Sequence, residues 1–272
     1  FFMALVSSKE GEQRVEQIAN GMNFFHWNLE FPEVFSGGNP GFDLVLANPP
    51  WEIEKANSRE FFSRYDASYM SLSKQAALLR QKELMAADKT IEAEWANYVA
   101  YHDGFSAFLQ KSNESLVPFR HQGGGDSNSY KLFLELGYLL LKTNGVMAQI
   151  VPSGIYSDKG STELRRLFID KCRWIFLNGY HNREGIFSIH RSFKFCTLGV
   201  VKGGQTKQVD CRFLRVSPDE ADEGPVAYKT DILKKLSPAH LAFTEISQIS
   251  QLRLIEKLAN VCIPLGALQQ RQ

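Results

Sequence analysis

The chain has 272 residues, of which 44% are apolar and 12% aromatic, so it can bury a sizeable core, and one large domain or one domain plus part of another is expected. Its net charge of +1 excludes a uniformly basic nucleic-acid-binding protein but not a local basic face. No apolar run approaches the roughly 20 residues that cross a bilayer, and the apolar start Phe1–Val6 is too short for a signal peptide. We therefore expect a cytoplasmic protein with no membrane partner. The first residue is not Met, which suggests that the chain was cut from a longer protein.

The four cysteines are widely spaced and contain no Cys-x-x-Cys pair, so the sequence indicates neither a zinc site nor a disulfide framework. We expect no bound metal, and we expect these residues to be buried free thiols. They are Cys172, Cys196, Cys211 and Cys262.

The first part of the chain leads to one distinctive corner. Residues 8–22 have the pattern of a polar amphipathic helix, and an aromatic-rich segment and a glycine-containing loop follow. Phe42–Ala47 is then an apolar strand with the pattern of a buried one. It ends in Asn48-Pro49-Pro50-Trp51.

This corner offers two hydrogen-bond acceptors beside an aromatic face. Two prolines in succession stop the strand and hold the Pro49 carbonyl outward, because proline fixes φ and carries no N–H. The Asn48 side-chain oxygen is a second acceptor, and the Trp51 indole is a surface on which a flat ring can stack. The set fits a planar group with an exocyclic NH₂. If both N–H hydrogens are held, the nitrogen can pyramidalise as an electrophile approaches, and no strong base is required.

Asn48-Pro49-Pro50-Trp51 resembles motif IV of the class I S-adenosylmethionine-dependent methyltransferases that modify an amino nitrogen, chiefly DNA adenine N6 methyltransferases. The resemblance implies that Asn48 and Pro49 bind the amino group while Trp51 stacks on the base. In similar enzymes the segment before motif IV lies beside the adenine of the cofactor. We therefore expect His26 or Trp27 to touch the cofactor, although a core role for these aromatics is the stronger alternative.

Between residues 52 and 103 there is no Gly or Pro, and the stretch is rich in Lys, Glu, Ala, Gln and Leu, which predicts a helical insertion of about residues 52–127. Its aromatic residues alternate with Arg and Lys. This combination suits stacking on bases and binding of phosphates, or else the aromatics are buried within the insertion and against the sheet. Both interpretations stay open.

Downstream, helices and strands alternate, which predicts a mostly parallel, doubly wound sheet. The expected elements are a helix with an N-cap at Asp126 or Ser127 that closes at 143–145, a strand over 146–151, a helix over 163–171, strands over 174–177 and 193–201, an edge strand over 211–216, and helices over 231–236 and 247–260.

The order of these elements is similar to that of the restriction-modification methylase family of the Eco57I type, from just before motif IV to the edge of the target-recognition region. Tyr130-x-x-Phe133 looks like the motif V helix, which adds Tyr130 to the substrate-binding residues. Phe187 resembles the motif VIII aromatic that packs on the far side of the extruded adenine, with Phe193 or Phe195 as alternatives. Arg191 and Lys194 would then hold the phosphates of the flipped nucleotide.

The family's cofactor pocket comes from a strand, a glycine-rich turn and an acid upstream of motif IV, and residues 1–41 contain no such set. We therefore expect a Rossmann-like α/β methyltransferase sheet that lacks its first strands. Residues 1–203 would be a partial catalytic domain, and residues 204–272 an extension that begins the target-recognition region. The rest of the parent methyltransferase is then an implied partner, together with double-stranded DNA.

The favoured hypothesis is part of an enzyme that methylates adenine N6 in DNA within a restriction-modification or phage-defence system. A second hypothesis keeps the fold and changes the acceptor, because release-factor glutamine methyltransferases and some RNA enzymes also use Asn-Pro-Pro-aromatic. The long insertion over 52–127 speaks against a compact glutamine enzyme. A third hypothesis is a catalytically idle DNA-binding or scaffold remnant.

Overall fold

The computed structural model describes residues 25–110, 118–125, 127–220 and 224–261, together with Lys9, residues 11–13 and Glu16. It contains two compact units, residues 1–42 and residues 43–272. Most of the helix predicted over 8–22 lies outside the described residues. In the first unit, α3 (Trp27–Glu30) and α4 (Pro32–Phe35) are single helical turns.

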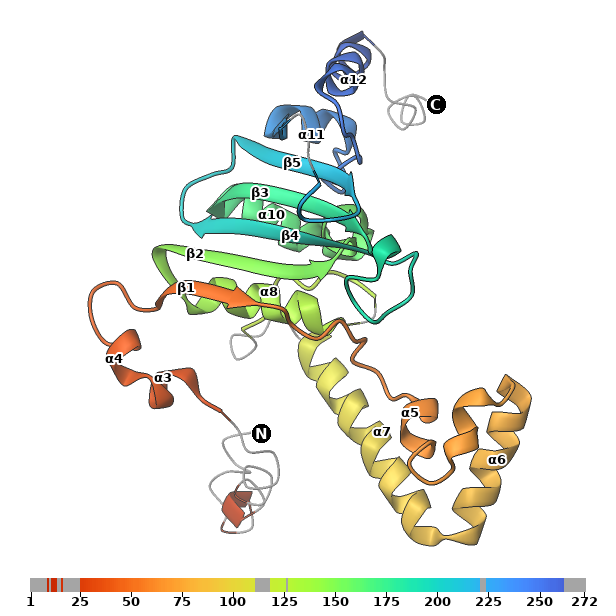
Figure 1. The fold of residues 1–272 in the computed structure, drawn as a ribbon. Coiled ribbons are helices and arrows are strands. Elements are labelled where there is room, and N and C mark those ends of the chain that lie inside the picture. Colours follow the sequence, from red (N-terminus) through yellow and green to blue (C-terminus); the bar gives the residue numbers. More distant parts are fainter. Residues whose placement is uncertain are drawn as a thin grey trace, which may run out of the picture. The chain divides into compact units, whose positions relative to one another are not determined.

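A six-stranded sheet forms the centre of the second unit, in the order β1-β2-β4-β3-β5-β6 (Figure 1). Helices cover it, so the α/β class is confirmed. The strands are β1 (Phe42–Ala47), β2 (Leu141–Pro152), β3 (Cys172–His181), β4 (Lys194–Lys202), β5 (Gln208–Arg215) and β6 (Val226–Lys229).

Strands β1, β2, β3 and β5 point in one direction, as expected for a mostly parallel sheet (Figure 1). Neighbouring strands are nevertheless antiparallel in several places, because β4 lies between β2 and β3 and runs against both. The connection from β3 to β4, residues 182–193, contains only the 3₁₀ turn Asn182–Glu184 and no α-helix of the kind that usually links parallel strands. The sequence pattern did not predict that β4 would lie between β2 and β3 and run antiparallel to both.

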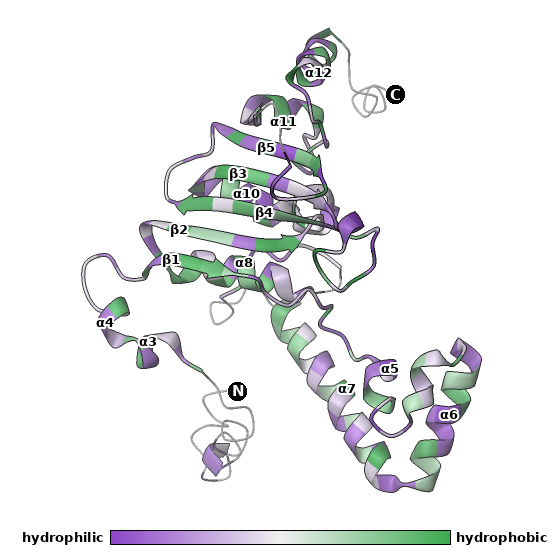
Figure 2. Cartoon of the chain, viewed as in Figure 1, coloured by the Kyte–Doolittle hydropathy of each residue, from purple (hydrophilic) through white to green (hydrophobic). Residues whose placement is uncertain are grey.

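Two helices cover one face of the sheet. α8 (Ser129–Leu140) packs on β2, α10 (Thr162–Lys171) packs on β3, and the two helices contact each other. The core between them and the sheet contains large side chains such as Leu134, Phe168 and Trp174, all at most 1% exposed. In Figure 2 the strands carry green hydrophobic stretches, and β5 also carries purple hydrophilic ones.

Strand β1 is less covered than its sequence predicted. Val45 packs against the core, whereas Leu44 and Leu46 on the opposite side are 58% and 75% exposed. The strand stands at the end of the sheet order, so among the described residues one of its edges has no neighbouring strand.

The predicted helices of the insertion are present. They are α5 (Ser58–Phe62), the 3₁₀ turn η1 (Ala67–Ser71), α6 (Lys74–Ala87) and α7 (Lys89–Gln110). Their aromatics include Phe61, Phe62 and Tyr69, each at most 3% exposed, and these side chains form a separate small core. For these residues the structure agrees with the interpretation that the insertion buries its aromatics.

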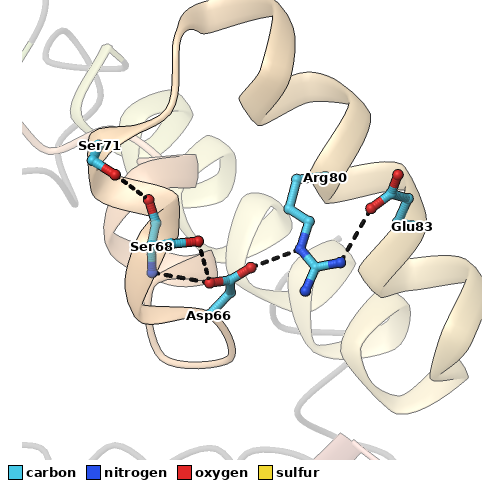
Figure 3. Close-up of polar contacts among 5 residues, drawn as sticks. All are labelled: Asp66, Ser68, Ser71, Arg80 and Glu83. Carbon is cyan, nitrogen blue, oxygen red and sulfur yellow. Dashed lines mark hydrogen bonds and ion pairs between the residues drawn. The ribbon is translucent and has the colours of Figure 1, made fainter.

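A polar cluster joins η1 to α6 (Figure 3). The Asp66 carboxylate accepts hydrogen bonds from the Ser68 backbone at 2.9 Å and the Ser68 hydroxyl at 2.6 Å, and it pairs with Arg80 at 2.6 Å. Arg80 also reaches Glu83 at 3.1 Å. The hydrogen bonds from Ser68, followed by that from Arg80, lower the pKa of Asp66 to about 2.

Several predicted boundaries are wrong in detail. The N-cap of α8 is Asn128 and not Ser127. The Ser127 carbonyl instead accepts a hydrogen bond from the Glu54 N–H at 2.8 Å. Asp126 lies outside the described residues. α8 ends at Leu140, and β2 takes up the predicted turn, with Asn144 at a φ of 65°. The strand predicted at the edge, β5, is internal because β6 pairs with it.

The remaining helical segments lie between and after these strands. They are α9 (Gly154–Ser157), η2 (Lys159–Ser161), η3 (Asn182–Glu184), α11 (Thr230–Leu236) and α12 (Ile249–Val261). The sheet continues beyond residue 203, where we predicted a domain boundary. Strand β5, which follows that residue, pairs in parallel with β3. That residues 204–272 begin a target-recognition region stays a prediction.

Cys172, Cys196 and Cys211 are buried free thiols, as predicted, and Cys262 lies outside the described residues. In the part of the chain that the structure describes, no helix is long and apolar enough to cross a membrane.

Candidate active site

The Asn48–Trp51 corner leaves the end of β1. Asn48 and Pro50 are exposed, Pro49 is buried and Trp51 is partly buried. The chain after the corner is fixed by the start of α8, where the Ser129 N–H donates to the Glu52 carbonyl at 2.9 Å. The corner is therefore anchored on a helix while the Asn48 side chain remains accessible.

The indole of Trp51 has a fixed orientation. Its Nε1–H donates to the Ile150 carbonyl of β2 at 3.2 Å. Phe187 meets the indole edge to face, with centroids 5.1 Å apart and planes at 66°. Phe193 and Phe195 lie nearly parallel to it, at 10° and 27°, with centroids 5.8 and 6.0 Å away. The three aromatics that the sequence proposed as partners all contact Trp51.

A cavity of about 530 Å³ opens beside this aromatic cluster. Trp51 and Phe193 form its aromatic wall, and its polar lining includes Asn128, Ser153 and Asp158. A cavity of this size with one flat apolar wall and a few polar groups suits a small planar ligand.

Asn182 organises the loop that carries Phe187. It is 0% exposed, and its Oδ1 accepts the Phe187 N–H at 2.9 Å. Its Nδ2 donates to the carbonyls of Phe187 at 3.0 Å and Ile189 at 3.2 Å, and it lies 3.4 Å from the His190 carbonyl. The turn before Phe187 is closed by Gly185, at a φ of 74° in the left-handed region that glycine tolerates best.

The two cations predicted to hold phosphates already have protein partners. Lys194 lines the cavity and pairs with Glu245 at 2.6 Å, and Glu245 also accepts a hydrogen bond from the Tyr156 hydroxyl at 2.8 Å. Burial alone would raise the pKa of Glu245, but the hydrogen bonds from Lys194 and Tyr156 outweigh it and lower the pKa. The exposed Arg191 donates to the Arg183 carbonyl at 2.7 Å.

Tyr130 also lines the cavity. It is 4% exposed, and its hydroxyl is 3.4 Å from the Ser161 hydroxyl. Burial raises its pKa to about 12, so it is a neutral hydrogen-bonding group at physiological pH.

His26 and Trp27 belong to the first unit. The Trp27 ring packs on Phe25 at 4.9 Å, Phe31 at 5.8 Å and Phe42 at 5.7 Å, whereas His26 is exposed. Trp27 is thus partly buried among aromatic rings, and contact of either residue with a cofactor stays a prediction.

Sequence reasoning missed the groups that orient the site. These groups hold Trp51, Phe187 and Lys194, and no motif marks them in the sequence. They are the Ile150 carbonyl, Asn182 and Glu245. For Asn182 a weak signal exists, since asparagine side chains often hydrogen-bond nearby backbone groups in turns. Among the described residues, no group of three or more His, Cys, Asp and Glu side chains is placed to hold a metal ion.

Part of the chain matches a known protein family. The family model described as Eco57I restriction-modification methylase matches residues 5–93, which include Asn48–Trp51, and this match confirms the resemblance drawn from that motif. No curated protein matches the chain.

Solved structures match at low identity. A type I restriction-modification methyltransferase subunit from Streptococcus thermophilus is 15% identical to this chain, with a TM-score of 0.35. The match covers 81% of this chain and 32% of the other. The type IIG restriction endonuclease BpuSI is 15% identical with coverages of 85% and 21% and a TM-score of 0.38. The EcoKI M protein is 22% identical with coverages of 50% and 30% and a TM-score of 0.32. This chain thus spans about a third or less of each of these proteins.

Proposed function

We propose that the chain is part of a DNA methyltransferase in a restriction-modification or phage-defence system, because residues 5–93 match the family model described as Eco57I restriction-modification methylase. The reaction transfers a methyl group from S-adenosylmethionine to adenine N6 in double-stranded DNA. The observation that carries the proposal is the exposed Asn48 in a corner whose Trp51 lines an open cavity of about 530 Å³.

The corner acts on the amino nitrogen. The Asn48 side-chain oxygen and the Pro49 carbonyl accept the two N6 hydrogens, and Pro50 holds the turn in shape. These hydrogen bonds favour a pyramidal nitrogen whose lone pair points at the incoming methyl group, so they stabilise the transition state more than the planar ground state. When bound, S-adenosylmethionine would supply the methyl group as an electrophile and leave as S-adenosylhomocysteine, and the methylated nitrogen would release one proton to water.

The aromatic cluster holds the extruded base. Trp51 stacks on one face, and Phe187 closes the other, with Phe193 as the alternative because its ring is parallel to the indole. A base between two parallel rings needs two contact distances, about 7 Å, so the 5.8 Å between Trp51 and Phe193 must widen when it enters. Arg191 and Lys194 would bind the phosphates of the flipped nucleotide, and Tyr130 lines the pocket.

The cofactor pocket is shared with the rest of the methyltransferase. Residues 1–41 contain no glycine-rich turn after a strand, so the principal cofactor-binding elements lie in the parent protein. In this chain Asn48 would contribute to the wall nearest the amino group, and contact of His26 or Trp27 with the adenine of the cofactor is a separate prediction. The chain alone is therefore expected to bind the cofactor poorly.

The experiment that tests the proposed function identifies the methylated product. The complete protein is incubated with methyl-labelled S-adenosylmethionine and, separately, duplex DNA, RNA and a release factor. We expect label in N6-methyladenine from duplex DNA. Label in glutamine or RNA would instead support the glutamine or RNA methyltransferase hypothesis, and no label in any acceptor would support the idle DNA-binding remnant.

A further inference from the structure

The loop between β3 and β4 carries the aromatic side of the proposed base pocket, yet few of its residues are buried. Ile186, Ile189 and Phe193 are 42%, 41% and 38% exposed, so hydrophobic packing alone holds this loop weakly. Its shape must come mainly from hydrogen bonds.

Those hydrogen bonds converge on Asn182. The side chain bonds both the N–H and the carbonyl of Phe187 and also the carbonyl of Ile189, as described above. The Asn182 backbone N–H adds a bond to the Phe193 carbonyl at 2.9 Å, which ties together the two ends of the loop. One buried side chain therefore fixes the part of the backbone from which Phe187 projects.

Phe187 in turn contacts the site. Its ring lies 5.1 Å from the Trp51 indole and 4.9 Å from the Phe195 ring. A shift of the Phe187 backbone would change the distance between the two aromatic residues that we place on opposite faces of the base.

We infer that Asn182 is a positioning residue for methyl transfer: it holds Phe187 where the ring can close on an extruded adenine. It does not touch the base itself. This inference rests on the proposed function and adds to it the side chain that gives the aromatic wall its geometry. Its consequence is specific, because loss of Asn182 should weaken retention of the flipped base rather than binding of the duplex.

The decisive variant is Asn182→Asp in the complete protein. Asp has the same size and keeps the acceptor for the Phe187 N–H, but it replaces the N–H donors with an oxygen that faces the Phe187 and Ile189 carbonyls. Asn182→Ser is a milder second variant that keeps the loop testable if Asp prevents folding. Asn97→Asp is the control, since it makes the same chemical change at an exposed asparagine on α7.

Three measurements follow each variant: duplex affinity, the single-turnover rate of methyl transfer, and the fluorescence of 2-aminopurine at the target position, which rises when the base leaves the stack. For Asn182→Asp we expect duplex affinity within about twofold of wild type, a rate about 10- to 100-fold lower, and a reduced fluorescence rise. A mismatch opposite the target makes extrusion easier and should restore most of the rate. Asn97→Asp should behave as wild type.

A double-mutant cycle tests whether Asn182 acts through Phe187. If it does, Asn182→Asp adds little to the loss caused by Phe187→Ala. The inference is overturned if Asn182→Asp transfers methyl at the wild-type rate, if the mismatch restores nothing, or if the two losses multiply. Failure of the proposed function is a different result, because the wild-type protein itself would then not methylate DNA.

Discussion

The ring of Phe193 lies within 10° of parallel to the Trp51 indole, with the centroids 5.8 Å apart, while the indole N–H is bonded to the Ile150 carbonyl at 3.2 Å. Trp51 is thus held by a hydrogen bond on the β2 side and faces the ring of Phe193 on the loop side. This relationship makes the indole the reference surface of the proposed base pocket.

The first prediction concerns this surface. Trp51→Phe keeps a stacking ring but loses the bond to Ile150, and we expect a methyl-transfer rate about 3- to 10-fold lower. Trp51→Ala also removes the stacking surface and should lower the rate by a further factor of about 10 or more. Single-turnover kinetics with saturating DNA measure both. Equal rates for the Phe and Ala variants would show that the ring does not stack on the base.

The second prediction concerns Lys194, which is paired with Glu245. If Lys194 binds a phosphate, Lys194→Met should weaken DNA binding and reduce the slope of log affinity against log salt concentration by about 1. Glu245→Gln removes the competing carboxylate and should tighten binding. Lys207→Met, at an exposed lysine that lines a different cavity, is the control. An unchanged salt slope in Lys194→Met would exclude the phosphate contact.

The third prediction is a pH dependence in the insertion. The folded pKa of Asp66 is lowered to about 2, below its ordinary value, so the carboxylate stabilises the folded state above the ordinary pKa. That stabilisation is lost as pH falls through about 2. Because the site is near the surface, the effect on the melting temperature should be small.

The control for this pH dependence is Asp66→Asn, since Asn can still cap η1 but does not titrate. Between about pH 4 and pH 2 the melting temperature of wild type should approach that of Asp66→Asn. A constant difference between the two proteins over this range would contradict the assignment.

The fourth prediction compares two glycines. Gly185 has a φ of 74°, and a Cβ there would lie 3.0 Å from the Arg191 guanidinium carbon, so Gly185→Ala should destabilise the fold by about 1–2 kcal/mol. Gly104 lies within α7 with nothing within 4 Å of an added Cβ, so Gly104→Ala should stabilise by about 1 kcal/mol. Denaturant unfolding measures both. A stabilised Gly185→Ala protein would contradict the described loop geometry.

Local patterns predicted the elements whose residues decide their own structure. The apolar run Phe42–Ala47 before two prolines predicted β1 within its observed bounds, and the Gly-free stretch after Trp51 predicted the helices of the insertion. Asn48–Trp51 predicted a site because the chemistry lies in consecutive residues. These features need no knowledge of distant parts of the chain.

Long-range pairing explains what the sequence missed. β4 enters between β2 and β3, and β6 covers β5, because of pairing partners that no local pattern encodes. The same holds for the site. Asn182 and Glu245 are ordinary polar residues until the fold places one beneath Phe187 and the other beside Lys194.

The central claim is that Asn48 and the Pro49 carbonyl hydrogen-bond the adenine amino group during methyl transfer. The variant Asn48→Ala in the complete protein tests this claim most directly. Asn97→Ala, at an exposed asparagine on α7, is the control. We predict that Asn48→Ala folds with an unchanged melting temperature and binds duplex DNA, yet forms no detectable N6-methyladenine, while Asn97→Ala is as active as wild type. Formation of N6-methyladenine by Asn48→Ala at a rate near wild type would contradict the account.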